Sequence, residues 1–191
     1  MSQEICIFCG ASDPTRLGLR TAMEEFADGM LQRGWGLVYG GGRVGLMGVA
    51  ADRIMNGGGR VLGVIPRQLA SRELAHSGLT ELIEVDSMHA RKAIMYESSD
   101  AFVAMPGGFG TLDEVMEILT WKQLGIHQKP VVFANIEGYY DAMYEFFQRA
   151  QADGLLKAEY VSLCHFTNDV ASTLAYLDGH PPSNGRSMTW A

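Results

Sequence analysis

Apolar positions along the chain follow two alternating patterns. Short apolar or β-branched runs, typical of buried parallel strands, are separated by longer stretches in which apolar residues recur with the roughly 3.6-residue period of a helix. The predicted strands cover residues 4–9, 36–39, 61–65, 82–85, 100–105, 130–134 and 161–164. The predicted helices cover residues 15–33, 44–55, 87–98, 112–124, 139–152 and 169–177. This alternation predicts an α/β fold with a doubly wound parallel sheet of about seven strands and helices on both faces.

The chain is long enough to form one domain with its own core. It has 191 residues, of which 47% are hydrophobic, and we find no interdomain linker pattern and no internal repeat. We therefore expect a single domain over residues 1–178. Residues 179–191 contain Pro181, Pro182 and Gly185 without a packing pattern, which predicts a flexible C-terminal tail.

Charge and cysteine content narrow the classes of partner. The formal net charge of −7 argues against a broad nucleic-acid-binding surface but leaves room for a local basic pocket that holds a small anion. The sequence has neither a signal-peptide pattern nor an apolar stretch of about 20 residues that could span a bilayer, so we expect a cytoplasmic protein without a membrane partner. Cys6 and Cys9 face opposite sides of a predicted strand, so we expect buried, inert thiols. The histidines are scattered, and we expect no metal and no cofactor.

Four segments directly follow predicted strands, and ligands of open parallel sheets bind beyond these carboxyl ends. They are residues 10–12, 40–48, 66–67 and 106–114. The glycines of residues 40–48 resemble those of a dinucleotide-binding turn. That fingerprint, however, belongs to the first βα turn and needs an acidic residue at the end of the next strand, where this sequence has Pro66. NAD binding is therefore disfavoured.

Residues 106–114 form the strongest candidate for a phosphate site. Residues 107–110 are Gly-Gly-Phe-Gly, which permits close approach of the backbone to a ligand, and Thr111 is predicted to open the following helix. The N–H groups at a helix N-terminus lack intrahelical partners and attract anions. The lysine of a P-loop is missing, so a monophosphate fits better than ATP.

Charged residues near this segment each allow two interpretations. Thr111 and Glu114 have the spacing of a capping box, in which Glu114 would only bind the backbone N–H at the start of the helix. Alternatively, a carboxylate beside an anion site is well placed to act on water. Arg91 and Lys92 lie on the predicted helix that precedes the candidate strand. They could form a solvated face or hold a phosphate or ribose.

The segment Pro106-Gly107-Gly108-Phe109-Gly110-Thr111-Leu112-Asp113-Glu114 resembles the PGGxGTxxE signature of the LONELY GUY (LOG) family of cytokinin-activating phosphoribohydrolases. Residues 8–12, 38–42, 45–48, 63–66, 88–92, 120–127 and 129–130 resemble that family in the same order. The resemblance implies a Rossmann-like fold, a homodimer, and hydrolysis of N6-substituted adenosine 5'-monophosphates to the free base and ribose 5-phosphate. Many members also cleave AMP, so AMP nucleosidase activity remains open.

The resemblance also implies roles for individual residues. Arg91 and Glu114 match the catalytic pair. The positions that match substrate contacts are Glu73, Arg91, Lys92, Gly108, Phe109, Gly110, Thr111, Leu112, Asp113, Glu114 and Thr120. Thr120 lies roughly 240° around the helix from Glu114 and cannot share its face. We therefore hypothesise that Thr120 or Trp121 helps to build the pocket of a neighbouring subunit.

Two other functions are weighed against the hydrolase. A non-catalytic nucleotide-binding or carrier protein is the alternative, because a fold does not fix a function; the presence of both Arg91 and Glu114 favours the enzyme. Proteins of this kind have often been described as lysine decarboxylases. The four lysines, Lys92, Lys122, Lys129 and Lys157, lie in no recognisable pyridoxal-phosphate site.

Overall fold

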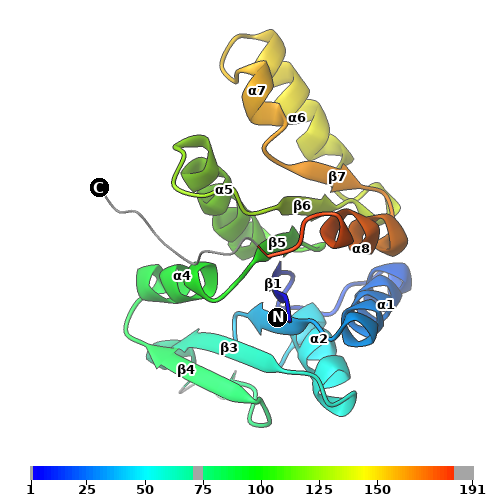
Figure 1. Cartoon of the computed structure of the whole chain (residues 1–191), viewed down its shortest axis with the longest axis vertical. Helices are drawn as coiled ribbons and strands as arrows, with labels where there is room; N and C mark the ends of the chain where they lie inside the picture. The colour runs from blue at the N-terminus through cyan, green and yellow to red at the C-terminus, as the bar shows by residue number, and fades with distance from the viewer. Residues whose placement is uncertain (1, 71–74, 183–191) are drawn as a thin grey trace.

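The computed structural model describes residues 2–70 and 75–182 of the chain. One sheet runs in the order β4-β3-β2-β1-β5-β6-β7, and each neighbouring pair of strands is parallel (Figure 1). The strands are β1 (Glu4–Phe8), β2 (Gly36–Tyr39), β3 (Val61–Pro66), β4 (Glu81–Val85), β5 (Ala101–Ala104), β6 (Val131–Ala134) and β7 (His165–Thr167). The predicted doubly wound α/β fold is therefore confirmed. The predicted tail lies outside the described residues from position 183 onward.

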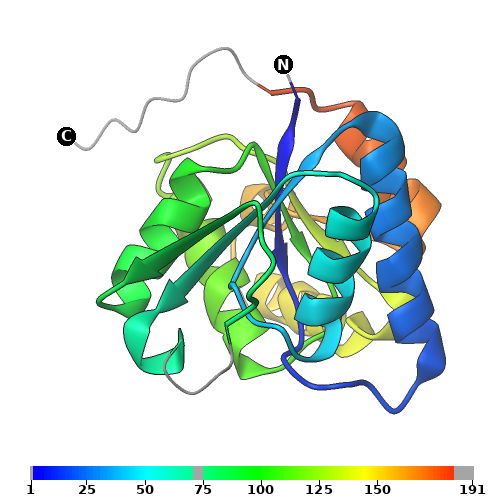
Figure 2. The ribbon, with the colours of Figure 1, turned by 90° about the horizontal axis from the view of Figure 1, so that it is seen from below.

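Helices cover both faces of this sheet, as predicted. They are α1 (Leu17–Arg33), α2 (Gly45–Asn56), α3 (Arg67–Leu69), α4 (Met88–Glu97), α5 (Phe109–Gln123), η2 (Ile136–Gly138), α6 (Asp141–Ala152), α7 (Ala158–Val161) and α8 (Val170–Asp178). One hydrophobic cluster joins α1, α2 and α8 to the sheet, and a second joins α4, α5 and α6 to the opposite face. Figure 2 shows α1 and α2, in blue and cyan, on the other side of the strands from α4 and α5, in green. No helix in the described ranges is both long and apolar enough to cross a bilayer.

Cys6 in β1 and Cys9 just after it lie on opposite faces of the sheet, as predicted. Cys6 belongs to the cluster under α4 and α5, whereas Cys9 belongs to the cluster under α1 and α2. Both are buried free thiols, and burial raises the pKa of each well above the ordinary value. They are therefore inert packing residues, as expected.

The predicted position of the seventh strand is wrong. Residues 161–164 were expected to be extended, but Val161 ends the short helix α7 and the strand is His165–Thr167. The register is set across the sheet, where Phe166 pairs with Phe133 and the two rings stack with their centroids 4.8 Å apart. β7 is an edge strand with only Thr167 buried, so it lacks the apolar run that marks the central strands. The helices α3 and α7 and the turn η2 were not predicted.

The strand order reverses beside β1, which pairs with β2 on one side and with β5 on the other. The loops that leave β1 and β5 are joined by a hydrogen bond of 3.0 Å from Gly10 N to Pro106 O. Such a reversal opens a crevice at the carboxyl ends of the strands. The fold thus places the segments after β1, β2 and β5 around one site.

The aromatic cluster under α6 gives a test of the fold. Phe133 is fully buried between Phe166, Tyr140 and Phe147. We expect Phe133→Ala to lower the free energy of unfolding by about 3–5 kcal/mol, because the cavity left behind cannot fill. Urea denaturation measures the loss. The control is Phe146→Ala, on α6 with 63% of the residue exposed, which should cost within about 0.5 kcal/mol. Equal losses for both variants would contradict this packing.

Candidate active site

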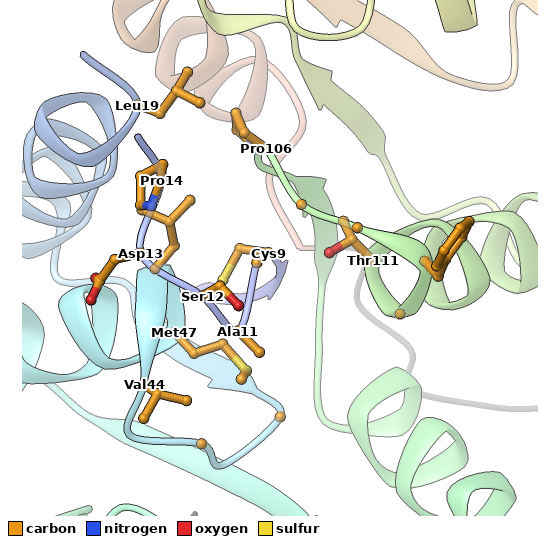
Figure 3. A pocket seen from close by; sticks show the side chains of 18 of the residues that line it. Cys9, Ala11, Ser12, Asp13, Pro14, Leu19, Val44, Met47, Pro106 and Thr111 are labelled. Atoms are coloured by element: carbon orange, nitrogen blue, oxygen red, sulfur yellow. The ribbon is translucent and has the colours of Figure 1, made fainter. Parts of the chain in front are cut away.

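A cavity of about 700 Å³ opens at the carboxyl ends of β1, β2 and β5. Its walls come from three of the four segments singled out in the sequence, residues 10–12, 40–48 and 106–114, together with Arg91 of α4. From the fourth region it takes Ile65 and Leu69, on either side of residues 66–67. Figure 3 shows Thr111 on one side of the cavity and Ser12, Val44 and Met47 on the opposite side. The predicted site is therefore one continuous cavity.

The start of α5 forms one wall of this cavity. The helix begins at Phe109, earlier than predicted, with Gly108 as its N-cap and no side-chain hydrogen bond to the cap. Its first N–H groups have no intrahelical carbonyl to bind and lie at the positive end of the helix dipole. Gly107 permits tight closure of the loop, because a Cβ atom there would lie 2.0 Å from Thr111 Oγ1. This wall is suited to an anion.

The hydroxyl of Thr111 adds a second sign of a polar ligand. Thr111 is 3% exposed, lines the cavity, and its Oγ1 is buried without a hydrogen-bond partner among the residues that the structure describes. Buried hydroxyls without a partner are uncommon, because each costs about 1–3 kcal/mol. A phosphate oxygen held by the N–H groups of α5 would supply the missing partner.

The capping-box interpretation of Glu114 is wrong. Gly108 is the N-cap residue, so Thr111 lies within the first turn and does not cap it. The carboxylate of Glu114 instead contacts Arg91, with Nη2 and Oε1 3.1 Å apart. Arg91 is 9% exposed and Glu114 is 7% exposed, and both line the cavity. The structure thus brings together the two residues that the family resemblance pairs.

Four features fix the guanidinium of Arg91. Helix α4 is capped by Ser87, whose hydroxyl accepts a hydrogen bond from Ala90 N at 3.1 Å. Arg91 Nε donates to Val64 O at 3.1 Å, and Nη1 lies 3.7 Å from Met88 Sδ. Gly40 leaves the space for Nη2, because a Cβ atom at that position would lie 1.9 Å from it. The solvated-face interpretation of Arg91 is therefore wrong.

Burial also changes the acidity of Glu114. Loss of water around the carboxyl raises its pKa, and the neighbouring Asp113 adds to this increase. The positive charge of Arg91 acts in the opposite direction but does not cancel the effect of burial. A carboxylate with a raised pKa is a stronger base than an exposed one, which suits it to accept a proton from water near neutral pH.

The other predicted contacts differ in how close they come to the cavity. Residues 108–111 line it, and Phe109 is 94% exposed at its edge. Leu112 and Asp113 are not among the residues that line it. Lys92 also lies outside the lining, where its ammonium contacts Asp113 at 3.2 Å and Glu117 at 2.8 Å. The exposed Thr120 donates its hydroxyl to Met116 O, away from the cavity of its own chain. Glu73 lies outside the described residues.

Tyr139 and Arg16 are among the cavity-lining residues that the sequence analysis did not single out. Tyr139 follows η2 and donates its hydroxyl to Gly107 O at 2.7 Å. Arg16 lies before α1, where it pairs with Glu137 at 3.5 Å. Arg16 lies in the segment that follows β1, so the rule that ligands bind after the strands could have identified this region. The contact of Tyr139, by contrast, joins segments 32 residues apart in the chain and leaves no local pattern.

None of the four lysines lines the cavity, and all four lie in the part of the chain that the structure describes. Besides Lys92, already described, Lys122 and Lys129 donate to the carbonyls of Lys129 and Tyr96, and Lys157 lies near Glu159 on the surface. The described residues also contain no group of three His, Cys, Asp or Glu side chains placed to hold a metal ion.

Two comparisons with known sequences relate the chain to described proteins. Residues 47–177 match a family model described as "Possible lysine decarboxylase". The chain is 45% identical to the rice protein named probable cytokinin riboside 5'-monophosphate phosphoribohydrolase LOGL9, over 94% of this chain and 79% of the relative. It is 44% identical to the Arabidopsis thaliana cytokinin riboside 5'-monophosphate phosphoribohydrolase LOG2, over 82% of this chain and 73% of the relative.

Solved structures share the fold. The Moco carrier protein of Chlamydomonas reinhardtii superposes with a TM-score of 0.71 at 24% identity, covering 94% of this chain and 97% of that one. The molybdenum cofactor binding protein of Rippkaea orientalis gives 0.70 at 19% identity, with the same coverage of both chains. These likenesses establish the fold, whereas the identity to the plant enzymes establishes kinship. The chain belongs to the LOG family, whose plant relatives are named cytokinin riboside 5'-monophosphate phosphoribohydrolases.

Proposed function

We propose that this protein hydrolyses the N-glycosidic bond of cytokinin riboside 5'-monophosphates and releases the free base and ribose 5-phosphate. The observation that carries the proposal is the buried pair of Arg91 and Glu114 in the same cavity as the unpartnered hydroxyl of Thr111. An anion site and a basic carboxylate are the two groups that this reaction needs. The names of the plant relatives support the same substrate class.

The start of α5 anchors the substrate in this scheme. The N–H groups of residues 108–111 and the hydroxyl of Thr111 bind the 5'-phosphate. Lys92 has no part in this scheme, because its ammonium is held by Asp113 and Glu117 outside the cavity lining. Binding of the phosphate, which does not react, positions the ribose so that the bond to be broken lies near Glu114.

Glu114 and Arg91 then carry out the chemistry. As the bond between C1' and N9 breaks, its electron pair leaves with the base, which takes up a proton, and positive charge builds on the ribose ring. The carboxylate of Glu114 stabilises that charge and removes a proton from the water whose oxygen bonds to C1'. Arg91 orients the carboxylate and reaches the ribose hydroxyls. AMP, which carries the same ribose and phosphate, is proposed as a second substrate.

The finer assignments of site and assembly are also proposals. We propose that Glu73, residues 108–111 and Glu114 contact substrate, and that the enzyme is a cytoplasmic homodimer. Thr120 is exposed and donates its hydroxyl to Met116 O of its own helix, and Leu124 beyond it is 67% exposed. A second subunit that packs on this end of α5 would bring Thr120 to the partner's cavity.

The decisive experiment is an assay of purified protein with AMP and with isopentenyladenosine 5'-monophosphate. We expect chromatography to detect free base and ribose 5-phosphate in equal amounts, because water cleaves a single bond. If both nucleotides bind and neither is cleaved, the protein is a carrier and the hydrolase proposal is wrong.

Glu114→Gln tests the catalytic carboxylate. The amide cannot accept a proton from water, so we expect kcat to fall by about 10²- to 10⁴-fold while nucleotide binding remains measurable by calorimetry. Glu117→Gln is the matched control, because it removes the same charge from the same helix at a residue that pairs with Lys92 outside the cavity lining. Turnover of Glu114→Gln at the rate of the control would remove Glu114 from the mechanism.

The raised pKa of Glu114 predicts the pH dependence. The carboxyl must be ionised to act as a base, and burial keeps it protonated to a higher pH than an ordinary glutamate. We expect kcat/KM to fall as the pH falls through this raised pKa, so the acid limb should lie above the value of about 4.3 for an unperturbed glutamate. A profile measured in constant-ionic-strength buffers checks this. An acid limb at or below the ordinary value would contradict the role of burial.

A further inference from the structure

The loop between β5 and α5 has its backbone carbonyls fixed one after another. Met105 O accepts from Tyr140 Oη at 2.8 Å, and Pro106 O accepts from Gly10 N at 3.0 Å. Gly107 O accepts from Tyr139 Oη at 2.7 Å, and the carbonyl of the N-cap residue Gly108 accepts the first hydrogen bond of the helix. Each carbonyl of residues 105–108 is therefore held by a donor of the protein.

The direction of a carbonyl also determines the direction of the next N–H group. In a trans peptide the C=O of one residue and the N–H of the next point in opposite directions, and the described chain contains no cis peptide. Fixing Gly107 O therefore fixes Gly108 N. Because the residues on both sides of this peptide unit are glycines, no side chain of their own opposes its rotation. Rotation would turn the carbonyl oxygen toward the proposed phosphate and the N–H away from it.

Tyr139 comes from a turn that is built to be rigid. Asn135 binds across it, with Nδ2 2.7 Å from Asp141 Oδ1 and Oδ1 2.6 Å from Tyr140 N. Glu137 takes a left-handed conformation with φ of 52°, which is costly for a residue other than glycine and persists only where its surroundings enforce it. Arg16 contacts Glu137 at 3.5 Å, and its guanidinium carbon lies 5.8 Å from the centre of the Tyr139 ring.

We propose that Tyr139 is a positioning residue that holds the Gly107–Gly108 peptide with its N–H directed at the 5'-phosphate. The proposal rests on the phosphate site of the proposed function. In this role the hydroxyl of Tyr139 increases the affinity for the phosphate and does not contact the bond that is cleaved. The turn after β6 thereby becomes part of the phosphate site.

Tyr140 supplies a matched control. Its hydroxyl also donates to a loop carbonyl, that of Met105, but the peptide unit that follows ends at Pro106, which has no N–H to offer a ligand. Met105 is also anchored to the sheet by the hydrogen bond from its own N to Phe8 O at 2.9 Å. Tyr140 is 3% exposed, so loss of its hydroxyl leaves a carbonyl buried without that partner. Tyr140→Phe therefore removes an equivalent hydrogen bond, with no effect on the direction of an N–H group.

The test compares Tyr139→Phe with Tyr140→Phe. Calorimetric titration with ribose 5-phosphate should show Tyr139→Phe binding roughly 3- to 10-fold more weakly than wild type, the value of one hydrogen bond, and Tyr140→Phe within about twofold. KM for the nucleotide should rise by the same factor in Tyr139→Phe with kcat unchanged, because the contact acts on bound substrate and transition state alike. Thermal unfolding should show Tyr140→Phe destabilised at least as much as Tyr139→Phe.

The outcomes separate this proposal from the proposed function. If wild type releases base and Tyr139→Phe binds ribose 5-phosphate as wild type does, the positioning role is wrong and the hydrolase stands. Equal weakening in both variants also overturns it, because the hydroxyls would then act through stability alone. If wild type cleaves no nucleotide but the two variants differ in ribose 5-phosphate binding as expected, the hydrolase fails and the positioning role stands. A wild-type protein that does not bind ribose 5-phosphate overturns the positioning role.

Discussion

The contact between Arg91 and Glu114 is the constraint that most of the site depends on. Two charges buried this far lose most of their hydration, and the attraction between them repays that loss only with good geometry and further hydrogen bonds. The structure supplies the geometry from four places: Val64 on β3, Gly40 after β2, the capped helix α4 and the first turns of α5. A buried ion pair is weak evidence of stability. Its place in a cavity, beside the candidate anion site at the start of α5, is better explained by the chemistry it can perform.

The side chains of the site also explain why glycine stands at two positions beside them, Gly40 and Gly107. At Gly40 any side chain would displace the guanidinium, and at Gly107 any side chain would displace the hydroxyl of Thr111. Both glycines have negative φ, so the requirement comes from space and not from a left-handed backbone. The glycine-rich segment after β2, which resembles a dinucleotide-binding turn in the sequence, thus makes room for an arginine of the active site.

Sequence patterns correctly predicted the parts of the structure that are determined by neighbouring residues in the chain. The buried central strands, the helix periodicity and the glycine-rich loop before α5 all follow from neighbours in the chain. Sequence patterns did not predict the features that depend on contacts between segments distant in the chain. The register of β7 depends on Phe133, the position of Tyr139 depends on Gly107, and the spacing of Thr111 and Glu114 could not show that Glu114 faces α4. The pairing of Arg91 with Glu114 came from the family resemblance, and the structure supplied its physical basis.

The description of the matching family model as possible lysine decarboxylases is at odds with the chemistry of the cavity. A pyridoxal-phosphate enzyme forms a Schiff base with a lysine amine in its cavity, whereas the lysines of this chain lie outside the lining. The cations that line the cavity are Arg16 and Arg91, and a guanidinium does not form that Schiff base. The fold alone does not identify the function, because solved structures named as Moco carrier and molybdenum cofactor binding proteins share it, and one fold hosts many functions. A hydrolase needs a group that activates water, whereas a carrier does not, and Glu114 is a buried carboxylate with a raised pKa in the same cavity as the start of α5.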